Sequence, residues 1–112
     1  MRRTEATLLD IHRAGRLALE FVTETPDVRT FAADVKTRSA VLHQLLVMGE
    51  AVKRLPQSFR AAHPSIPWRR IAGMRDVLIH AYDEVDEAEV WRALTHDLPP
   101  VLDAIAPLLP RA

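Results

Sequence analysis

The stretch TFAADVKTRSAVLHQLLVMGEAVKRL, Thr30–Leu55, decides the fold that we expect from this sequence. Its apolar residues recur at helical spacing along its whole length, which predicts one long α-helix. Pro56 ends this helix, because proline has no N–H to donate and its ring clashes with the preceding turn. The apolar stripe is wide, which indicates contact on more than one side, such as a bundle core plus a partner. The stripe comprises Phe31, Val35, Val41, Leu42, Leu45, Met48, Gly49, Val52 and Leu55.

Helical periodicity continues on both sides of this stretch, and no segment alternates cleanly with the period of two that a strand requires. Residues suited to the first positions of helices stand where these patterns begin: Thr4, Pro67 and Asp86. We expect further helices at residues 4–22, around residue 59, at 68–81, at 86–96, and from residue 99 or 100 onwards. Short connections favour antiparallel neighbours. The sequence therefore predicts an all-α, up-and-down bundle of four to five helices in one domain, residues 1–112.

Length and composition exclude several classes of protein and of functional site. The chain has 112 residues, and chains of this size often gain stability by self-association. Its 15 basic and 15 acidic residues give a net charge near zero, which argues against a broad basic surface for nucleic acid but leaves room for a local phosphate site. The absence of cysteine excludes disulfides, thiolate metal sites and cysteine nucleophiles. No apolar run approaches membrane-spanning length and the N-terminus lacks a signal-peptide pattern, so we expect a soluble, cytoplasmic protein.

One segment gathers reactive residue types: RDVLIHAY, Arg75–Tyr82. On a helix, Arg75 and Tyr82 are seven residues apart and share a face, while Asp76 and His80 share another. Arg75 and His80 are five residues apart, so their Cα positions diverge by about 140° around a straight helix. A direct Arg–His pair therefore requires a helix break near His80 or a second subunit packed face to face.

These residue types suit metal-independent cleavage of RNA, which carries its own nucleophile, the 2′-hydroxyl. His80 can act as base or acid because its ordinary pKa lies near working pH. Arg75 can bind the phosphoryl oxygens through two parallel hydrogen bonds. Asp76 can orient the imidazole of His80. This chemistry needs neither metal nor cofactor. The alternative is an exposed helix surface on which Asp76 and His80 form an ordinary i,i+4 pair.

Other polar residues and the glycines give weaker signals. Glu50 lies on a largely apolar stretch, and we expect it to pair with an arginine across the bundle rather than to act near the reactive segment. Gly15, Gly49 and Gly73 each cost about 1 kcal/mol in a helix, which indicates close helix approach. At Gly73, room for a ligand or a partner backbone is the alternative. The remaining histidines share no metal-binding spacing: His12, His43, His63 and His96.

The strings MGEAVKRL, HPSIPWRRIAGMRDVLIHAY, EVD, VW and DLPP occur in this order. With them, the sequence resembles the HepT-like toxins of the HEPN superfamily over nearly its whole length. The signature of that family is an arginine, four residues, a histidine, one residue and a tyrosine, here Arg75, His80 and Tyr82. The residue after the arginine is often asparagine in this family, whereas this chain has Asp76, which either orients His80 or repels the phosphate of a substrate.

The resemblance implies a HEPN-like helical bundle that forms a homodimer, with Arg75 and His80 of both chains lining a shared cleft. It implies a toxin that acts as a metal-independent endoribonuclease on RNA, without a cofactor. The implied partner is an MntA-like nucleotidyltransferase antitoxin, which would transfer AMP from ATP to Tyr82 and so block the cleft. The alternative is a non-catalytic dimeric module that binds a nucleotidyltransferase or a nucleotide, as the net charge near zero and Asp76 would suit.

Overall fold

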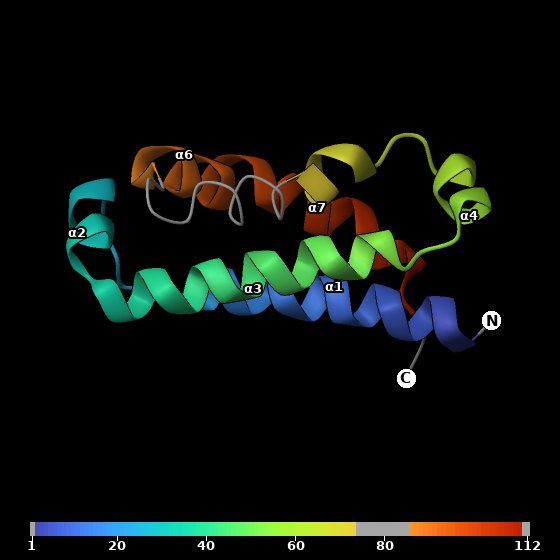
Figure 1. Cartoon of the computed structure of the whole chain (residues 1–112), viewed down its shortest axis with the longest axis horizontal. Coiled ribbons are helices and arrows are strands. Elements are labelled where there is room, and N and C mark those ends of the chain that lie inside the picture. Colours follow the sequence, from blue (N-terminus) through green and yellow to red (C-terminus); the bar gives the residue numbers. More distant parts are fainter. Residues whose placement is uncertain (1, 74–85, 111–112) are drawn as a thin grey trace.

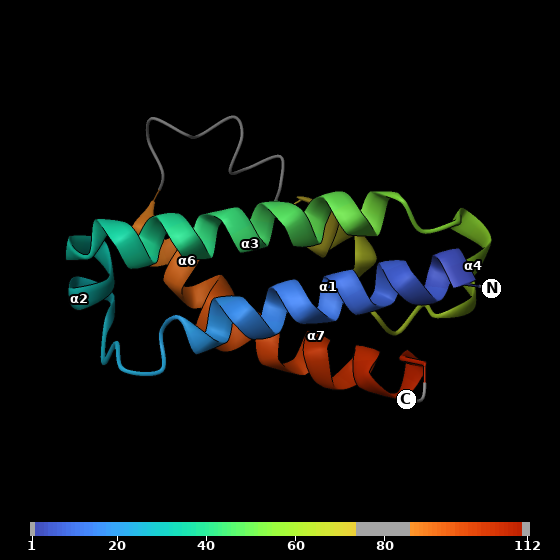
Figure 2. The ribbon, with the colours of Figure 1, turned by 90° about the horizontal axis from the view of Figure 1, so that it is seen from below.

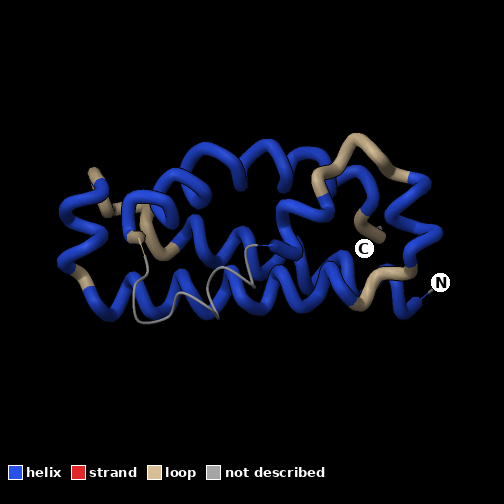
Figure 3. The backbone as a smooth tube through the Cα atoms, turned by 45° about the horizontal axis from the view of Figure 1, so that its top comes forward, coloured by secondary structure: helices blue, strands red, loops and turns tan. Residues whose placement is uncertain are grey.

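The computed structural model describes residues 2–73 and 86–110 of the 112-residue chain. All regular structure in these two ranges is helical (Figure 3). Helix α1 (Arg2–Glu20) lies beside α3 (Val35–Lys53), and the two run in opposite directions (Figure 1). On its other side, α1 packs against α7 (Leu98–Ile105), so α1 lies between α3 and α7 (Figure 2). The expected all-α helical bundle is confirmed.

Buried core residues come from α1, α2 (Val28–Ala33), α3, residues 66–71, α6 (Glu87–Arg92) and α7. Most of the stripe residues expected to be internal are buried, including Ile11, Met48, Ile71 and Leu94. At Gly15 the helices approach closely, because a Cβ placed there would lie 2.7 Å from Cδ2 of Leu102 on α7. The interpretation of Gly15 as a close-approach residue is therefore confirmed.

The first helix begins earlier than expected. Thr4 was predicted to be an N-cap, but it lies inside α1 and is only 7% exposed. The neighbouring Thr7 is also buried, and its Oγ1 donates a hydrogen bond to the carbonyl of Arg3 at 2.9 Å. This bond satisfies the Thr7 hydroxyl within the helix, so that Thr7 can lie on a buried face.

The long helix expected from Thr30 to Leu55 is in fact two helices, α2 (Val28–Ala33) and α3, separated at Asp34. The Asp34 carboxylate accepts hydrogen bonds from the N–H of Thr37 at 3.1 Å and from its hydroxyl at 2.6 Å. These bonds lower the pKa of Asp34, the hydroxyl of Thr37 contributing most. Aspartate at an N-cap with a donor three residues later is a helix start, so α3 begins here with a new direction.

The break at Asp34 has a consequence for packing. Val35 was expected in the apolar stripe, but it is 61% exposed. Phe31, on the other side of the break, is fully buried and its ring lies 5.3 Å from that of Trp91. Helix α2 therefore folds over toward α6 (Glu87–Arg92) instead of extending α3 (Figure 1).

The expected fourth and fifth helices form one continuous helical run. Helix α6 passes into a π-helical segment, Ala93–Asp97, and then directly into α7. The N–H of Leu98 reaches back five residues to the carbonyl of Ala93. The wider π-turn precedes Pro99 and Pro100, which have no N–H to donate. The prolines therefore lie in the first turn of α7, as expected, but no loop precedes them.

Between α3 and the reactive segment, the chain forms α4 (Gln57–Ala62) and then a helix over residues 68–73. The short helical turn expected around Phe59 is confirmed as α4. The helix expected over residues 68–81 begins at Trp68 and is described as far as residue 73. The rest of the expected range, residues 74–81, lies outside the described residues.

Candidate active site

The four candidate site residues, Arg75, Asp76, His80 and Tyr82, all lie within residues 74–85, outside the described ranges. The described residues show what holds each end of this segment: the helical turns at residues 68–73 before it, and Asp86 with α6 after it.

The chain leading into the segment is fixed by buried aromatic and aliphatic side chains. Trp68 is 6% exposed, and its indole N–H donates a hydrogen bond to the carbonyl of His63 at 3.0 Å. The ring of Phe59 lies between, 6.1 Å from Trp68 and 4.6 Å from His63. Ile66 and Ile71 are buried on either side of Trp68. These contacts fix the direction in which the chain enters residue 74.

The chain leading out of the segment is fixed by a helix cap. The Asp86 side chain accepts hydrogen bonds from the N–H groups of Ala88 at 3.0 Å and Glu89 at 3.3 Å, as expected for an N-cap. Arg38 on α3 lies 3.9 Å from the Glu87 carboxylate and also donates to the carbonyl of Ala32. The start of α6 is thus tied to both α2 and α3.

Two residues singled out near the segment have distinct surroundings. Glu50 is half-buried on α3, while the expectation that it pairs with an arginine stays a prediction. At Gly73 no heavy atom of the described residues lies within 4 Å of an added Cβ. Close approach of a described helix is therefore not the reason for glycine at position 73, in contrast to Gly15.

The four described histidines differ in their surroundings. His43 and His96 are exposed, and His63 ends α4 with its ring against Phe59. Partial burial lowers the pKa of His12, and the nearby Arg16 guanidinium lowers it further. Within residues 2–73 and 86–110, no three histidine, aspartate or glutamate side chains are grouped so that they could hold a metal ion.

The sequence patterns did not reveal the aromatic contacts that anchor the segment. Periodicity places Trp91 beside the stripe residue Val90 and says nothing of its partner. The hydrogen bond from Trp68 to His63 crosses a turn, and the ring contact of Trp91 with Phe31 joins elements that are far apart along the chain. The proximity of Trp68 to two prolines, Pro64 and Pro67, was the one signal that could have identified a fixed turn.

Comparison with known proteins gives consistent matches. The family described as "Ribonuclease HepT-like" matches residues 11–108. The chain is 43% identical to "Probable ribonuclease HepT" of Thermococcus cleftensis over 100 residues, covering 88% of this chain and 90% of that protein. It is 32% identical over 100 residues to "Putative RNase MJ1380" of Methanocaldococcus jannaschii, covering 89% and 91%.

A third relative, "Putative RNase TTE0752" of Caldanaerobacter subterraneus, is 42% identical over 69 residues, which cover 62% of each chain. No solved structure matches the chain. Among the described residues, no helix is both long and apolar enough to cross a bilayer. The family match includes the second half of α1, all of α2, α3, α4, α6 and α7, and the whole Arg75–Tyr82 segment. This chain belongs to the ribonuclease HepT-like family.

Proposed function

We propose that this protein is a metal-independent endoribonuclease in which Arg75 and His80 carry out the reaction. The observation that carries the proposal is the family match over residues 11–108, which includes both residues, together with relatives named as ribonucleases. The anchored ends of residues 74–85 support it, because a catalytic segment must be held in a defined place.

The reaction would proceed by attack of the 2′-oxygen on the adjacent phosphorus. His80 takes the 2′-hydroxyl proton, the P–O2′ bond forms, and the P–O5′ bond breaks. The leaving 5′-oxygen takes a proton from water and His80 returns its proton to solvent, so the products end in a 2′,3′-cyclic phosphate and a 5′-hydroxyl. Arg75 binds the phosphoryl oxygens as their negative charge increases, and Asp76 orients the imidazole of His80.

The test is an RNA cleavage assay with purified protein in EDTA. We expect the wild-type protein to cleave RNA and to leave cyclic phosphate ends, and the His80→Ala variant to lose about 10²–10⁴-fold in rate, the usual contribution of a positioned acid or base. An absence of cleavage in both proteins, or equal cleavage by both, would remove the proposal. Gel analysis before and after acid opening of the cyclic phosphate identifies the product end.

In the same proposal, the protein is a homodimer, with the Arg75 and His80 residues of both chains at one cleft. It is the toxin of a toxin–antitoxin pair, and a MntA-like nucleotidyltransferase is its antitoxin. The antitoxin transfers AMP to the Tyr82 hydroxyl, with pyrophosphate as the leaving group from ATP. The added phosphate would repel RNA from Arg75, which lies seven residues away.

Modification of Tyr82 is tested by intact mass. We expect the mass of the protein to rise by one or more AMP units after incubation with ATP, Mg²⁺ and a nucleotidyltransferase encoded beside it. The Tyr82→Phe variant should stay at its unmodified mass, because it lacks the hydroxyl. An increase that persists in Tyr82→Phe would place the modification elsewhere.

If wild-type protein neither cleaves RNA nor slows growth yet binds the nucleotidyltransferase, the non-catalytic binding module is the better description.

A further inference from the structure

The net charge near zero hides an uneven distribution of charge. From Ala51 to Gly73 there are five basic residues and no aspartate or glutamate. The rest of the chain therefore has ten basic and fifteen acidic residues. The five basic residues are Lys53, Arg54, Arg60, Arg69 and Arg70.

The fold places this basic stretch on the end of α3, on α4 and on residues 68–73. Helix α4 lies at the end of the bundle opposite to α2, and residues 68–73 lie between α4 and the middle of the bundle (Figure 1). The contacts of Phe59 and Trp68 with His63 join α4 to residues 68–73. Arg60 on α4 and Arg69 and Arg70 are therefore carried by elements that are fixed to each other.

Among the described residues, no acidic side chain forms an ion pair with any of these three arginines. Arg69 and Arg70 are exposed, and neither makes an ion pair or hydrogen bond within the described part of the chain. Arg60 is half-buried, and its Nε is buried without a hydrogen-bond partner. By contrast, Arg54 lies 3.5 Å from the Asp10 carboxylate. Unpaired guanidinium groups retain their full attraction for phosphate.

These arginines lie close along the chain to the candidate catalytic segment. Residues 68–73 lead directly into the segment that contains Arg75 and His80. A phosphate bound at Arg69 or Arg70 would therefore lie only a few residues along the chain from that segment. Between them, Gly73 has no side chain, and no described heavy atom lies within 4 Å of the position that a Cβ would occupy there.

We propose that Arg60, Arg69 and Arg70 form a basic surface that binds the phosphates of an RNA strand next to the site of cleavage. This inference rests on the proposed ribonuclease function and adds how the substrate is held. Contacts of this kind bind the backbone irrespective of base, and they position the strand without selecting a sequence. Such a surface is a local phosphate site of the kind that a net charge near zero leaves room for.

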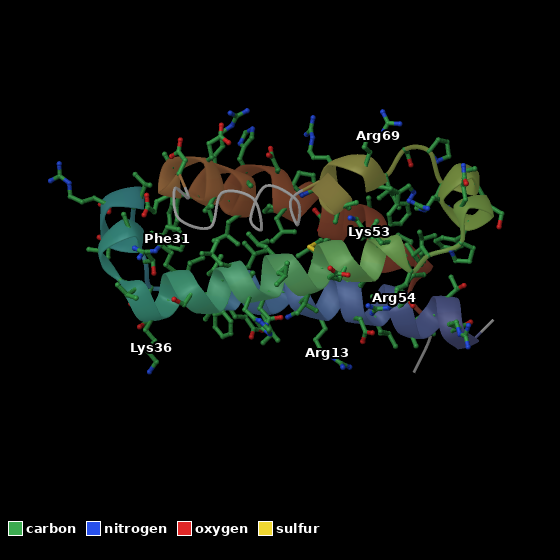
Figure 4. The ribbon with its side chains drawn as sticks, in the orientation of Figure 1. Arg13, Phe31, Lys36, Lys53, Arg54 and Arg69 are labelled. Atoms are coloured by element: carbon green, nitrogen blue, oxygen red, sulfur yellow. The ribbon has the colours of Figure 1, made fainter. Side chains whose placement is uncertain are left out.

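The test compares two double variants that remove the same charge. Arg69→Gln/Arg70→Gln removes two arginines of the basic surface, while Arg13→Gln/Lys36→Gln removes two exposed cations from the opposite edge (Figure 4). All four side chains are exposed, so folding should be preserved in both variants. The probe is a fluorescent single-stranded RNA carrying 2′-O-methyl groups throughout, which has no free 2′-hydroxyl and so cannot be cleaved by this chemistry.

Fluorescence anisotropy at several salt concentrations gives the Kd and its salt dependence. Each phosphate contact contributes about 0.7 to the slope of log K against log salt for single strands, or about fivefold in Kd at 0.1 M salt. We expect Arg69→Gln/Arg70→Gln to weaken binding by about 25-fold, with a slope shallower by about 1.4. Addition of Arg60→Gln should weaken binding about fivefold further, and the control pair should change Kd less than about twofold.

Equal affinities of the two double variants, or no measurable binding by the wild-type protein at 0.1 M salt, would overturn the basic surface. These results are separable from the ribonuclease test, which uses cleavable RNA. Cleavage by the wild-type protein with equal affinities would leave the ribonuclease standing and remove the basic surface. Arginine-dependent binding without cleavage would support the basic surface and contradict the ribonuclease.

Discussion

Replacement of Arg75 by alanine is expected to lower kcat for RNA cleavage by about 10²–10³-fold, the usual effect of removing one donor that stabilises charge in the transition state. The reason is specific to guanidinium, which can give two parallel hydrogen bonds to the phosphoryl oxygens. Arg75→Lys keeps the charge but loses this paired geometry, so its kcat should lie between those of Arg75→Ala and the wild-type protein. Single-turnover cleavage of a short RNA in EDTA measures the chemical step.

Arg13→Ala is the matched control for this experiment. Arg13 is an exposed arginine on α1, and its side chain points away from the bundle at the edge opposite to Arg69 (Figure 4). We expect its cleavage rate to equal that of the wild-type protein. If Arg75→Ala and Arg13→Ala cleave RNA at the same rate, Arg75 has no part in the reaction. Full activity of Arg75→Lys would reduce the role of Arg75 to that of a point charge.

Replacement of Phe31 by alanine is expected to reduce the free energy of unfolding by about 3–5 kcal/mol, the range for removing a large buried aromatic side chain. Phe31 is fully buried, and its ring contacts Trp91 at a centroid distance of 5.3 Å. The contact joins α2 to α6, so its loss also loosens the element that follows residues 74–85. Since domains of this size have about 5–15 kcal/mol of stability in total, this loss is a large fraction of the free energy of unfolding.

Urea unfolding at a fixed protein concentration measures this change, because self-association would otherwise alter the apparent stability. Val35→Ala is the control, since Val35 is an apolar residue four positions along the chain but is 61% exposed. It should change the free energy of unfolding by less than about 0.5 kcal/mol. A loss below about 1 kcal/mol for Phe31→Ala, or equal losses for both variants, would contradict the packing of α2 against α6.

The two variants also separate stability from activity. Arg75→Ala removes a group proposed to contact the substrate, whereas Phe31→Ala weakens the packing of α2 against α6, the helix that follows residues 74–85. If Phe31→Ala is folded without urea, its kcat at saturating RNA should be lost as the temperature approaches its lowered unfolding midpoint. Arg75→Ala should instead be slow at all temperatures at which the protein is folded.

The sequence by itself predicted the fold class and most of the buried positions. Apolar residues at helical spacing have to be buried whatever the partners are, so Leu8, Ile11, Leu45, Val52 and Ile105 could be placed in the core. Local signals also located helix starts where a side chain bonds its own backbone, as at Asp86. The Arg75–Tyr82 segment could also be identified from the sequence, because all of its motif residues lie within one short stretch of the chain.

The tertiary structure decided what depends on contacts between distant residues. An unbroken apolar stripe across Asp34 suited a single helix, but Asp34 caps α3 and the burial of Phe31 against Trp91 favours a change of direction there. Likewise, 15 basic and 15 acidic residues sum to no net charge. The contacts among Phe59, His63 and Trp68 join the elements that carry Arg60, Arg69 and Arg70. Composition counts charges, but electrostatic attraction depends on where they lie, and packing between remote elements sets those positions.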